Sequence, residues 1–368
     1  MAGDHDQPAN PHQGAIKVAV AQATPVFLNR EATVDKACAW IARAGGEGAN
    51  LVVFPESFIP AYPDWVWAVP PGEKEVLNPL YTELFENAVE IPGPVTRRLG
   101  EAARQAGTYV VAGVTERSQE SSSGSLYNTL VYIDPQGQLM GRHRKLVPTG
   151  GERLVWAQGD GSTLQVFDTP LGKLGGLICW ENYMPLARYA MYAWGVQIYV
   201  AATWDNGEGW LATLRHIARE GRVFVLGCGM VLSKKDIPDR LAFKRFYKEG
   251  YDWINTGDSA IVSPEGEFIT GPLKKEEGLL YAEIHPAQVT ASKWMLDVTG
   301  HYNRPDIFQL TVNRSPRPSI KVIEPGRAAG ADPRLLASLR PAGLKAPPAP
   351  AAGKIPEATE HPAADKEE

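Results

Sequence analysis

The stretch Leu174-Gly175-Gly176-Leu177-Ile178-Cys179-Trp180-Glu181-Asn182 decides how this chain folds, because a strand and a helix meet in it. Its apolar residues and two glycines predict a short buried strand that ends at Cys179. A helix is predicted over residues 186–194, with Asn182 as its N-cap and Pro185 in its first turn. We therefore expect the cysteine on a sharp strand-to-helix bend with free backbone N–H groups close by, a place where a thiol can be both exposed and made acidic.

The elements around this stretch form an internal repeat. Each half predicts strand, helix, strand, helix, strand and then a hairpin with a Pro-x-Gly turn. The second half carries an insertion around residues 233–248. Two such units predict two sheets packed face to face with helices outside, an α-β-β-α sandwich of the α/β class. The predicted segments are 16–21, 29–44, 49–55, 95–106, 108–112, 127–133 and 138–143, then 174–178, 186–194, 196–200, 210–220, 222–226, 260–262 and 267–270.

The composition is that of an ordinary globular protein. The chain has 368 residues, of which 44% are hydrophobic and 21% charged, and its net charge of −5 argues against a nucleic-acid or membrane surface. Three cysteines make no disulfide framework and fit a reducing compartment, and two of them, Cys38 and Cys228, are interpreted as core residues. Since no apolar run suits a signal peptide or a membrane span, we expect a cytoplasmic protein.

A single domain is predicted over residues 15–314, because the two halves share no linker-like join. Residues 1–14 are polar and are predicted to be a flexible N-terminus. Residues 315–368 are rich in proline and alanine and have few large apolar side chains. Such a segment cannot bury enough surface to offset the cost of ordering, so we predict a mostly disordered tail.

Candidate catalytic partners for Cys179 lie in the first half. Glu56 follows a buried strand; if it is buried beside the thiol, its pKa should rise and it can take the thiol proton. Lys145 follows the first hairpin, and its ammonium would lower the thiol pKa and stabilise anionic nitrogen or oxygen. Glu152 is a candidate positioning residue. Each residue has a structural alternative. Glu56 would be a solvated glutamate at the start of a loop, Lys145 would belong to a solvated strand edge, and Glu152 would form a salt bridge within its loop.

Together these residues resemble the nitrilase superfamily, whose glutamate, lysine and cysteine occur in this chain order. The resemblance is close to the nitrilase branch and spans residues 16–312. Ala157 and Ala202 stand where glycine and proline are common in the family, which bears on pocket shape. The blocks that carry the resemblance are Phe54-Pro55-Glu56, His143-Arg144-Lys145-Leu146-Val147-Pro148-Thr149, Trp156-Ala157-Gln158-Gly159-Asp160-Gly161-Ser162, Cys179-Trp180-Glu181-Asn182-Tyr183-Met184-Pro185-Leu186-Ala187-Arg188, Thr203-Trp204-Asp205 and Asp297-Val298-Thr299-Gly300-His301-Tyr302.

The resemblance implies the same α-β-β-α sandwich that the repeat predicts. It also implies hydrolysis of an organic nitrile to a carboxylic acid and ammonia, through a thioimidate and a thioester on Cys179. The loop of residues 57–67, together with Trp156 and Trp180, would wall an apolar substrate pocket and favour an apolar nitrile. The alternative is that these aromatic residues near strand ends belong to the core. These pocket candidates are Tyr62, Trp65, Trp156 and Trp180.

Family resemblance further implies homo-oligomers, including dimers that build into spirals or filaments. We expect the predicted helix after Cys179 to lie at a subunit contact, through its aromatic residues Tyr189, Tyr192 and Trp194.

Other functions are consistent with parts of the sequence. An amidase or carbamoylase of the same superfamily would use the same three residues on an amide C–N bond. A cysteine–histidine hydrolase would need one of His143, His216, His285 or His301 beside the thiol. A binding protein on this fold is the non-enzymatic alternative. No spacing of histidines and cysteines suggests a metal, and the glycines of residues 158–161 lack a dinucleotide-binding context, so we expect no cofactor.

Overall fold

The computed structural model describes residues 14–118 and 124–317. All of these described residues belong to one compact unit. The predicted flexible N-terminus, residues 1–14, and the predicted tail, residues 315–368, lie almost entirely outside the described residues. Within the described ranges, no helix combines the length and the hydropathy that a membrane span requires.

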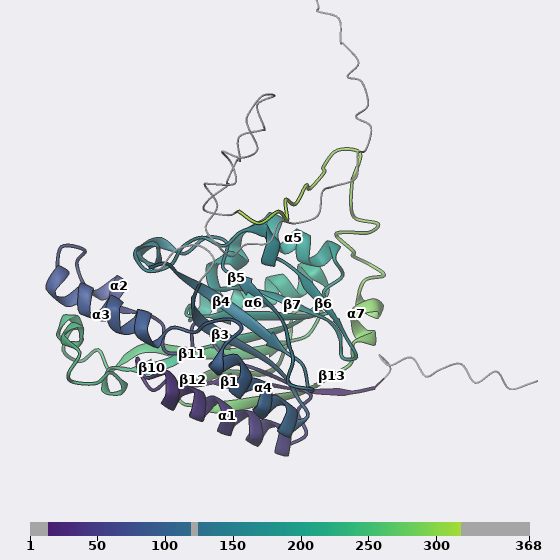
Figure 1. Ribbon diagram of the computed structural model, residues 1–368. Coiled ribbons are helices and arrows are strands. Elements are labelled where there is room, and N and C mark those ends of the chain that lie inside the picture. Colours follow the sequence, from purple (N-terminus) through teal and green to yellow (C-terminus); the bar gives the residue numbers. More distant parts are fainter. Residues whose placement is uncertain (1–13, 119–123, 318–368) are drawn as a thin grey trace, which may run out of the picture. The chain divides into compact units, whose positions relative to one another are not determined.

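The first sheet has six strands in the order β13-β1-β2-β3-β4-β5 (Figure 1). Strands β1, β2 and β3 run parallel, and β4 and β5 form the predicted antiparallel hairpin. Strand β13 comes from late in the chain, pairs antiparallel with β1 and was not predicted. The bounds are β1 (Ile16–Gln22), β2 (Leu51–Val53), β3 (Tyr109–Arg117), β4 (Leu126–Ile133), β5 (Leu139–Arg144) and β13 (Gly278–Ile284).

The second sheet repeats this arrangement. Strands β7, β8 and β9 are parallel like β1, β2 and β3, and β11 with β12 corresponds to the hairpin of β4 and β5. Strands β6 and β10 lie at the two ends of the order β10-β11-β9-β8-β7-β6. The prediction of two pseudo-repeated halves is confirmed. The bounds are β6 (Val166–Thr169), β7 (Gly172–Ile178), β8 (Ile198–Thr203), β9 (Phe224–Gly229), β10 (Val231–Ser233), β11 (Trp253–Val262) and β12 (Phe268–Lys274).

Helices cover the outer faces of both sheets. In Figure 1, α1 and α4 lie on one side of the paired sheets and α5 and α6 on the other. Since successive side chains of a strand point to opposite faces, Leu51 and Val53 pack between the sheets while Val52 packs toward α1 and α4. The four-layer sandwich is thereby confirmed. The helices are α1 (Arg30–Gly46), α2 (Trp65–Ala68), α3 (Lys74–Asn87), α4 (Pro94–Ala106), α5 (Pro185–Ala193), α6 (Glu208–Gly221) and α7 (Ala287–Ser292).

The bend after β7 differs from its prediction in one respect. Residues Cys179–Tyr183 form a short 3-10 helix, η3, and α5 begins only at Pro185, so the prediction of Asn182 as its N-cap is wrong. The Asn182 side chain is buried and donates to the carbonyls of Leu177 (3.2 Å) and Cys179 (2.9 Å). It therefore closes the bend from within rather than capping the helix.

Two other segments were not anticipated in detail. Helix α3 (Lys74–Asn87) contains Pro79 and was not predicted. The insertion around residues 233–248 contains two short 3-10 helices, η4 (Lys234–Asp236) and η5 (Ala242–Phe246). Cys228 is buried, as predicted, and its thiol donates to the carbonyl of Val53 across the two sheets (3.3 Å).

Candidate active site

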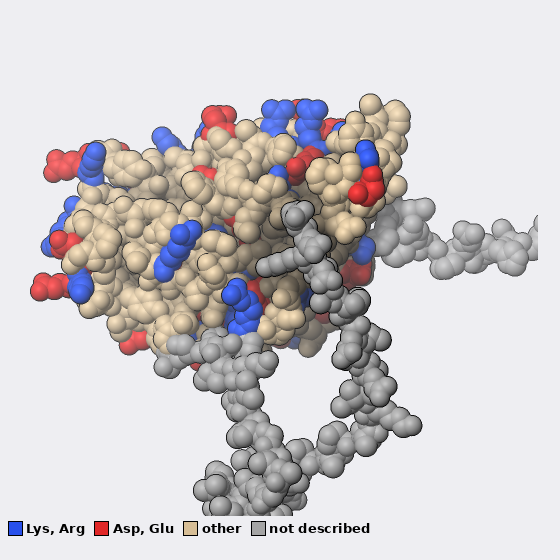
Figure 2. Space-filling model, turned by 90° about the horizontal axis from the view of Figure 1, so that it is seen from above, with Lys and Arg blue, Asp and Glu red and all other residues tan. Residues whose placement is uncertain are grey.

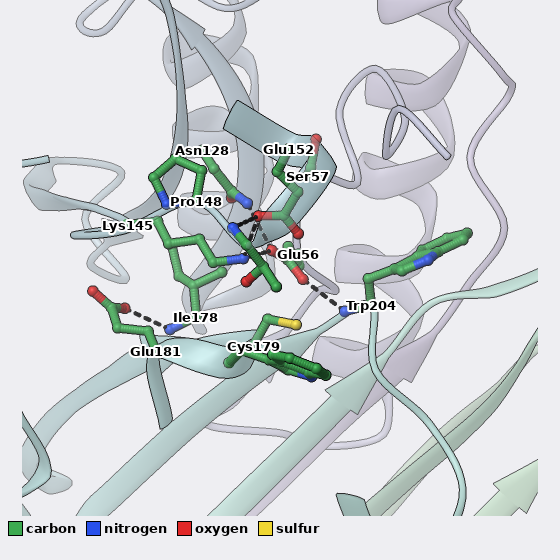
Figure 3. Close-up of polar contacts among 12 residues, drawn as sticks. Glu56, Ser57, Asn128, Lys145, Pro148, Glu152, Ile178, Cys179, Glu181 and Trp204 are labelled. Carbon is green, nitrogen blue, oxygen red and sulfur yellow. Dashed lines mark hydrogen bonds and ion pairs between the residues drawn. The ribbon is translucent and has the colours of Figure 1, made fainter. Parts of the chain in front are cut away.

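Three chain segments bring the predicted residues together. Glu56 follows β2 and Lys145 follows β5 in the first sheet, whereas Cys179 follows β7 in the second. Figure 3 shows the Cys179 sulfur pointing toward the Glu56 and Lys145 side chains. The two halves of the repeat therefore contribute different groups to one place.

Glu56 accepts hydrogen bonds from three sides. Its Oε1 accepts from Lys145 Nζ (2.8 Å) and from Asn128 Nδ2 (2.6 Å), and its Oε2 accepts from the backbone N–H of Trp204 (2.7 Å). Burial, with the nearby Glu152 carboxylate, raises the pKa of Glu56 although Lys145 opposes the shift. The expectation of a buried glutamate with a raised pKa is confirmed. Because Oε1 already has two donors, Oε2 is the oxygen with capacity for a further proton.

Lys145 lies between two carboxylates. Its Nζ donates to Glu56 and, at 2.8 Å, to Oε2 of Glu152, and the residue is only 1% exposed. Burial opposes the charge, but the two carboxylates raise the pKa of the ammonium, so Lys145 is a cation. The Tyr62 hydroxyl and the backbone N–H of Thr149 both donate to Glu152 at 2.7 Å. Glu152 is thus held in place and holds Lys145 in turn.

Cys179 is 4% exposed and has a φ of +51°, a conformation that costs an L-residue other than glycine ~1–2 kcal/mol. Burial, followed by the charge of Glu56, raises the thiol pKa well above its ordinary value and outweighs Lys145. The expectation of an exposed, acidic thiol is therefore wrong, because the sequence predicts the bend and its backbone N–H groups but not how deeply the bend is buried. The resting sulfur is an S–H group that needs a base.

A cavity of about 450 Å³ opens onto the sulfur. Tyr62 and Trp180 line it, as predicted, but Trp65 and Trp156 do not. Trp65 packs against Phe27 and Phe243 in the core, and Trp156 packs edge-on against Tyr62. The described lining is Tyr62, Asp64, Trp67, Thr149, Gly150, Glu152, Cys179, Trp180, Trp204, Asp205 and Asn206.

Several of these residues were missed by the sequence reasoning. Trp204 stacks on Tyr62 (ring centroids 4.3 Å apart), and its position directly after β8, the neighbour of β7, is the signal that could have found it.

Trp67 and Trp180 are 50% and 52% exposed, with their indole N–H groups bonded to Tyr62 and Asp205. Both therefore offer ring surface, rather than a donor, to a ligand.

None of the candidate histidines is among the described lining of this cavity. His143 is buried, and its Nε2 contacts Glu181 (2.9 Å) instead of the thiol. The part of the chain that the structure describes also holds no cluster of three or more histidine, cysteine, aspartate or glutamate side chains suited to a metal ion.

The sequence profile of the family described as "Carbon-nitrogen hydrolase" matches residues 17–293. The chain belongs to this carbon-nitrogen hydrolase family. Among proteins similar to this carbon-nitrogen hydrolase, Nitrilase 1 of Arabidopsis thaliana is 40% identical over 328 residues, covering 86% of this chain and 94% of that protein. The aliphatic nitrilase of Sinorhizobium fredii is 42% identical over 312 residues, covering 83% of this chain and 98% of that protein. A carbon-nitrogen hydrolase from Helicobacter pylori has a similar fold, with a TM-score of 0.62, 21% identity and coverage of 81% and 98%.

Proposed function

We propose that this carbon-nitrogen hydrolase is a nitrilase that converts an organic nitrile to a carboxylic acid and ammonia, with Cys179 as nucleophile. The observation that carries the proposal is the position of the Cys179 sulfur beside the Glu56–Lys145 pair, with Cys179 in the lining of a cavity that has aromatic walls. Identities of about 40% to nitrilases over most of the chain support the same activity.

The first step needs a base because the thiol is neutral at rest. Glu56 takes the thiol proton on Oε2, and the sulfur attacks the nitrile carbon to form a C–S bond. One π bond of C≡N becomes a lone pair on nitrogen, which receives the proton from Glu56 to give a thioimidate. The Lys145 ammonium, fixed by two carboxylates, stabilises the charge that develops on nitrogen.

Hydrolysis of the thioimidate uses the same groups again. Glu56 takes a proton from water as the water oxygen adds to the carbon, and the resulting tetrahedral intermediate loses ammonia after its nitrogen is protonated. A second water cleaves the thioester to the acid and restores the thiol. If the C–S bond of the first tetrahedral intermediate breaks instead, the product is the amide.

The cavity favours an uncharged nitrile with an aromatic or apolar group. Its described walls include four aromatic side chains, and two of them, Trp67 and Trp180, are 50% and 52% exposed. Aromatic rings stack on flat apolar groups and gain ~0.5–1.5 kcal/mol beyond area burial. Burial raises the pKa of Asp64 in the same wall to about 6.

Ammonia release from phenylacetonitrile and from acetamide tests the proposal, with Cys179→Ala as control. We expect release from the nitrile, none from the alanine variant, and an intact-mass adduct on wild-type protein alone. Release from acetamide but not from any of a panel of nitriles would replace the nitrilase with an amidase. Turnover by Cys179→Ala would remove the thioimidate route.

We also propose that the protein forms homo-oligomers, including dimers that build into spirals or filaments. Large apolar side chains are exposed late in the described chain, among them Trp294, Tyr302 and Phe308. Figure 2 shows one face on which most of the visible surface is neither acidic nor basic. Tyr192, expected at the contact, is instead buried and bonded to Glu220, so a contact along α5 would use other residues. A native mass showing monomer alone would contradict assembly.

A further inference from the structure

Glu181 is a buried carboxylate that touches the neighbours of two reacting residues. Its Oε2 accepts from the backbone N–H of Ile178 (2.8 Å), the residue before Cys179. Its Oε1 accepts from the backbone N–H of Leu146 (2.8 Å), the residue after Lys145. One side chain therefore ties the end of β5 to the end of β7.

This tie joins strands that share no sheet. β5 is the last strand of the first sheet and β7 belongs to the second, so no strand-pairing bonds fix one against the other. The bend at Cys179 is also conformationally costly because of its positive φ, and it needs neighbouring bonds to hold it. The bond from Ile178 to Glu181 lies directly on that bend (Figure 3).

His143 fixes the charge of Glu181. Its Nε2 lies 2.9 and 3.1 Å from the two carboxylate oxygens, and its Nδ1 lies 3.3 Å from the carbonyl oxygen of Thr163. Both ring nitrogens thus face acceptors, and only the imidazolium has an N–H for each. Burial opposes that charge, but the Glu181 carboxylate raises the pKa of His143. Burial likewise opposes ionisation of Glu181, but His143 and the two backbone donors hold its pKa below the ordinary value.

We propose that Glu181, paired with the imidazolium of His143, is a positioning residue that sets the separation between the Lys145 ammonium and the Cys179 sulfur. It acts through the backbone of Ile178 and Leu146 and touches neither reacting atom. This inference rests on the proposed nitrilase function.

The test compares Glu181→Gln with Glu116→Gln. In Glu181→Gln an amide NH₂ replaces one oxygen and faces a backbone N–H, so one of the two ties is lost. Glu116 is equally buried, and its Oε2 accepts from Nε of Arg144, the last residue of β5 (2.9 Å). Among the described residues, it has no bond to those beside Cys179. Both variants remove a buried carboxylate charge, and only one of them releases the bend.

The readouts are kcat and KM for phenylacetonitrile and the rate of Cys179 alkylation by iodoacetamide, located by peptide mass. They are taken at a temperature where both variants are folded. We expect Glu181→Gln to lower kcat about 10- to 100-fold with KM within about twofold, because small misplacements of reacting groups cost that much. Its alkylation rate should fall as well, whereas Glu116→Gln should leave kcat and alkylation within about threefold of wild type.

Equal losses in the two variants, or a Glu181→Gln enzyme within threefold of wild type, would overturn the proposal. If Glu181→Gln does not fold, His143→Gln is compared instead, since it keeps the carboxylate and both backbone bonds. We then expect about a three- to tenfold lower kcat at unchanged KM, and an unchanged kcat would overturn the proposal. If the wild type released no ammonia from any nitrile, the proposed function would fail, while the alkylation comparison would still decide the positioning role.

Discussion

Replacing Lys145 by methionine probes the central ion cluster. The change removes the ammonium that bonds Glu56 and Glu152, both at 2.8 Å, and leaves their carboxylates buried beside each other. Removing one partner of a buried ion pair costs ~3–5 kcal/mol. With an unfolding entropy of about 2.1 cal/mol/K per residue, a domain of about 300 residues loses roughly 5–8 °C in Tm. Loss of the cation should also lower kcat by about 10²–10³-fold.

The stability loss should depend on pH. Without Lys145, the pKa of Glu56, already raised by burial, rises further above its unfolded value. The folded variant then binds more protons than the unfolded chain, so its stability falls as pH rises through that pKa. Thermal unfolding followed by circular dichroism should therefore show a small deficit against wild type near pH 5 and a larger one near pH 8.

A double-mutant cycle with Glu152→Gln gives the decisive comparison. Removing the second carboxylate relieves the repulsion, so Lys145→Met/Glu152→Gln should be more stable than additivity predicts, by about 1–2 kcal/mol. Ammonia release should stay as low as in Lys145→Met. Additive losses of stability, or a deficit independent of pH, would refute the interpretation of these three residues as one charged cluster.

Three further outcomes are expected. Glu56→Gln should lower kcat by about 10²–10⁴-fold because no base takes the thiol proton. The pKa of Glu56 lies above its ordinary value of 4.5, and in wild type kcat/KM should fall as the pH drops through that pKa. The Glu56→Gln variant should lack this fall on the acid side of the pH profile, its acid limb. Asn128→Ala removes a donor that favours the Glu56 carboxylate, so the acid limb should move to higher pH, and an unmoved limb would contradict the assigned base. Trp180→Ala should raise KM for phenylacetonitrile about three- to tenfold. Acetonitrile should be affected less, and equal changes for the two substrates would argue against an aromatic contact.

The sequence predicts the catalytic candidates because each follows a strand of the internal repeat. Lys145 and Cys179 come directly after β5 and β7, and Glu56 comes three residues after the end of β2. The structure brings these three strand ends together. Strand β13 carries no comparable signal, because its partner β1 lies more than two hundred residues earlier in the chain. Long-range pairing of this kind leaves no local pattern.

Burial explains the incorrect predictions at the site. Trp65 and Trp67 are two residues apart on α2, a helix too short for its hydrophobic pattern to show which ring faces the core. The thiol of Cys179 is expected to be acidic from the backbone N–H groups at its bend and from Lys145, but its burial raises its pKa instead. Asn128 is a polar residue inside the buried strand β4, and this signal could have marked it as a partner of Glu56.

Glu56 and Lys145 follow strands of the first sheet, and Cys179 follows a strand of the second. Neither sheet therefore carries all three of these side chains. A shift of about 1 Å between the two sheets would lower turnover by about 10²-fold. The strand pairing inside each sheet, and with it the far-ultraviolet spectrum, would stay unchanged. The rate of turnover therefore reports the relative position of the two sheets more sensitively than a measurement of secondary structure does.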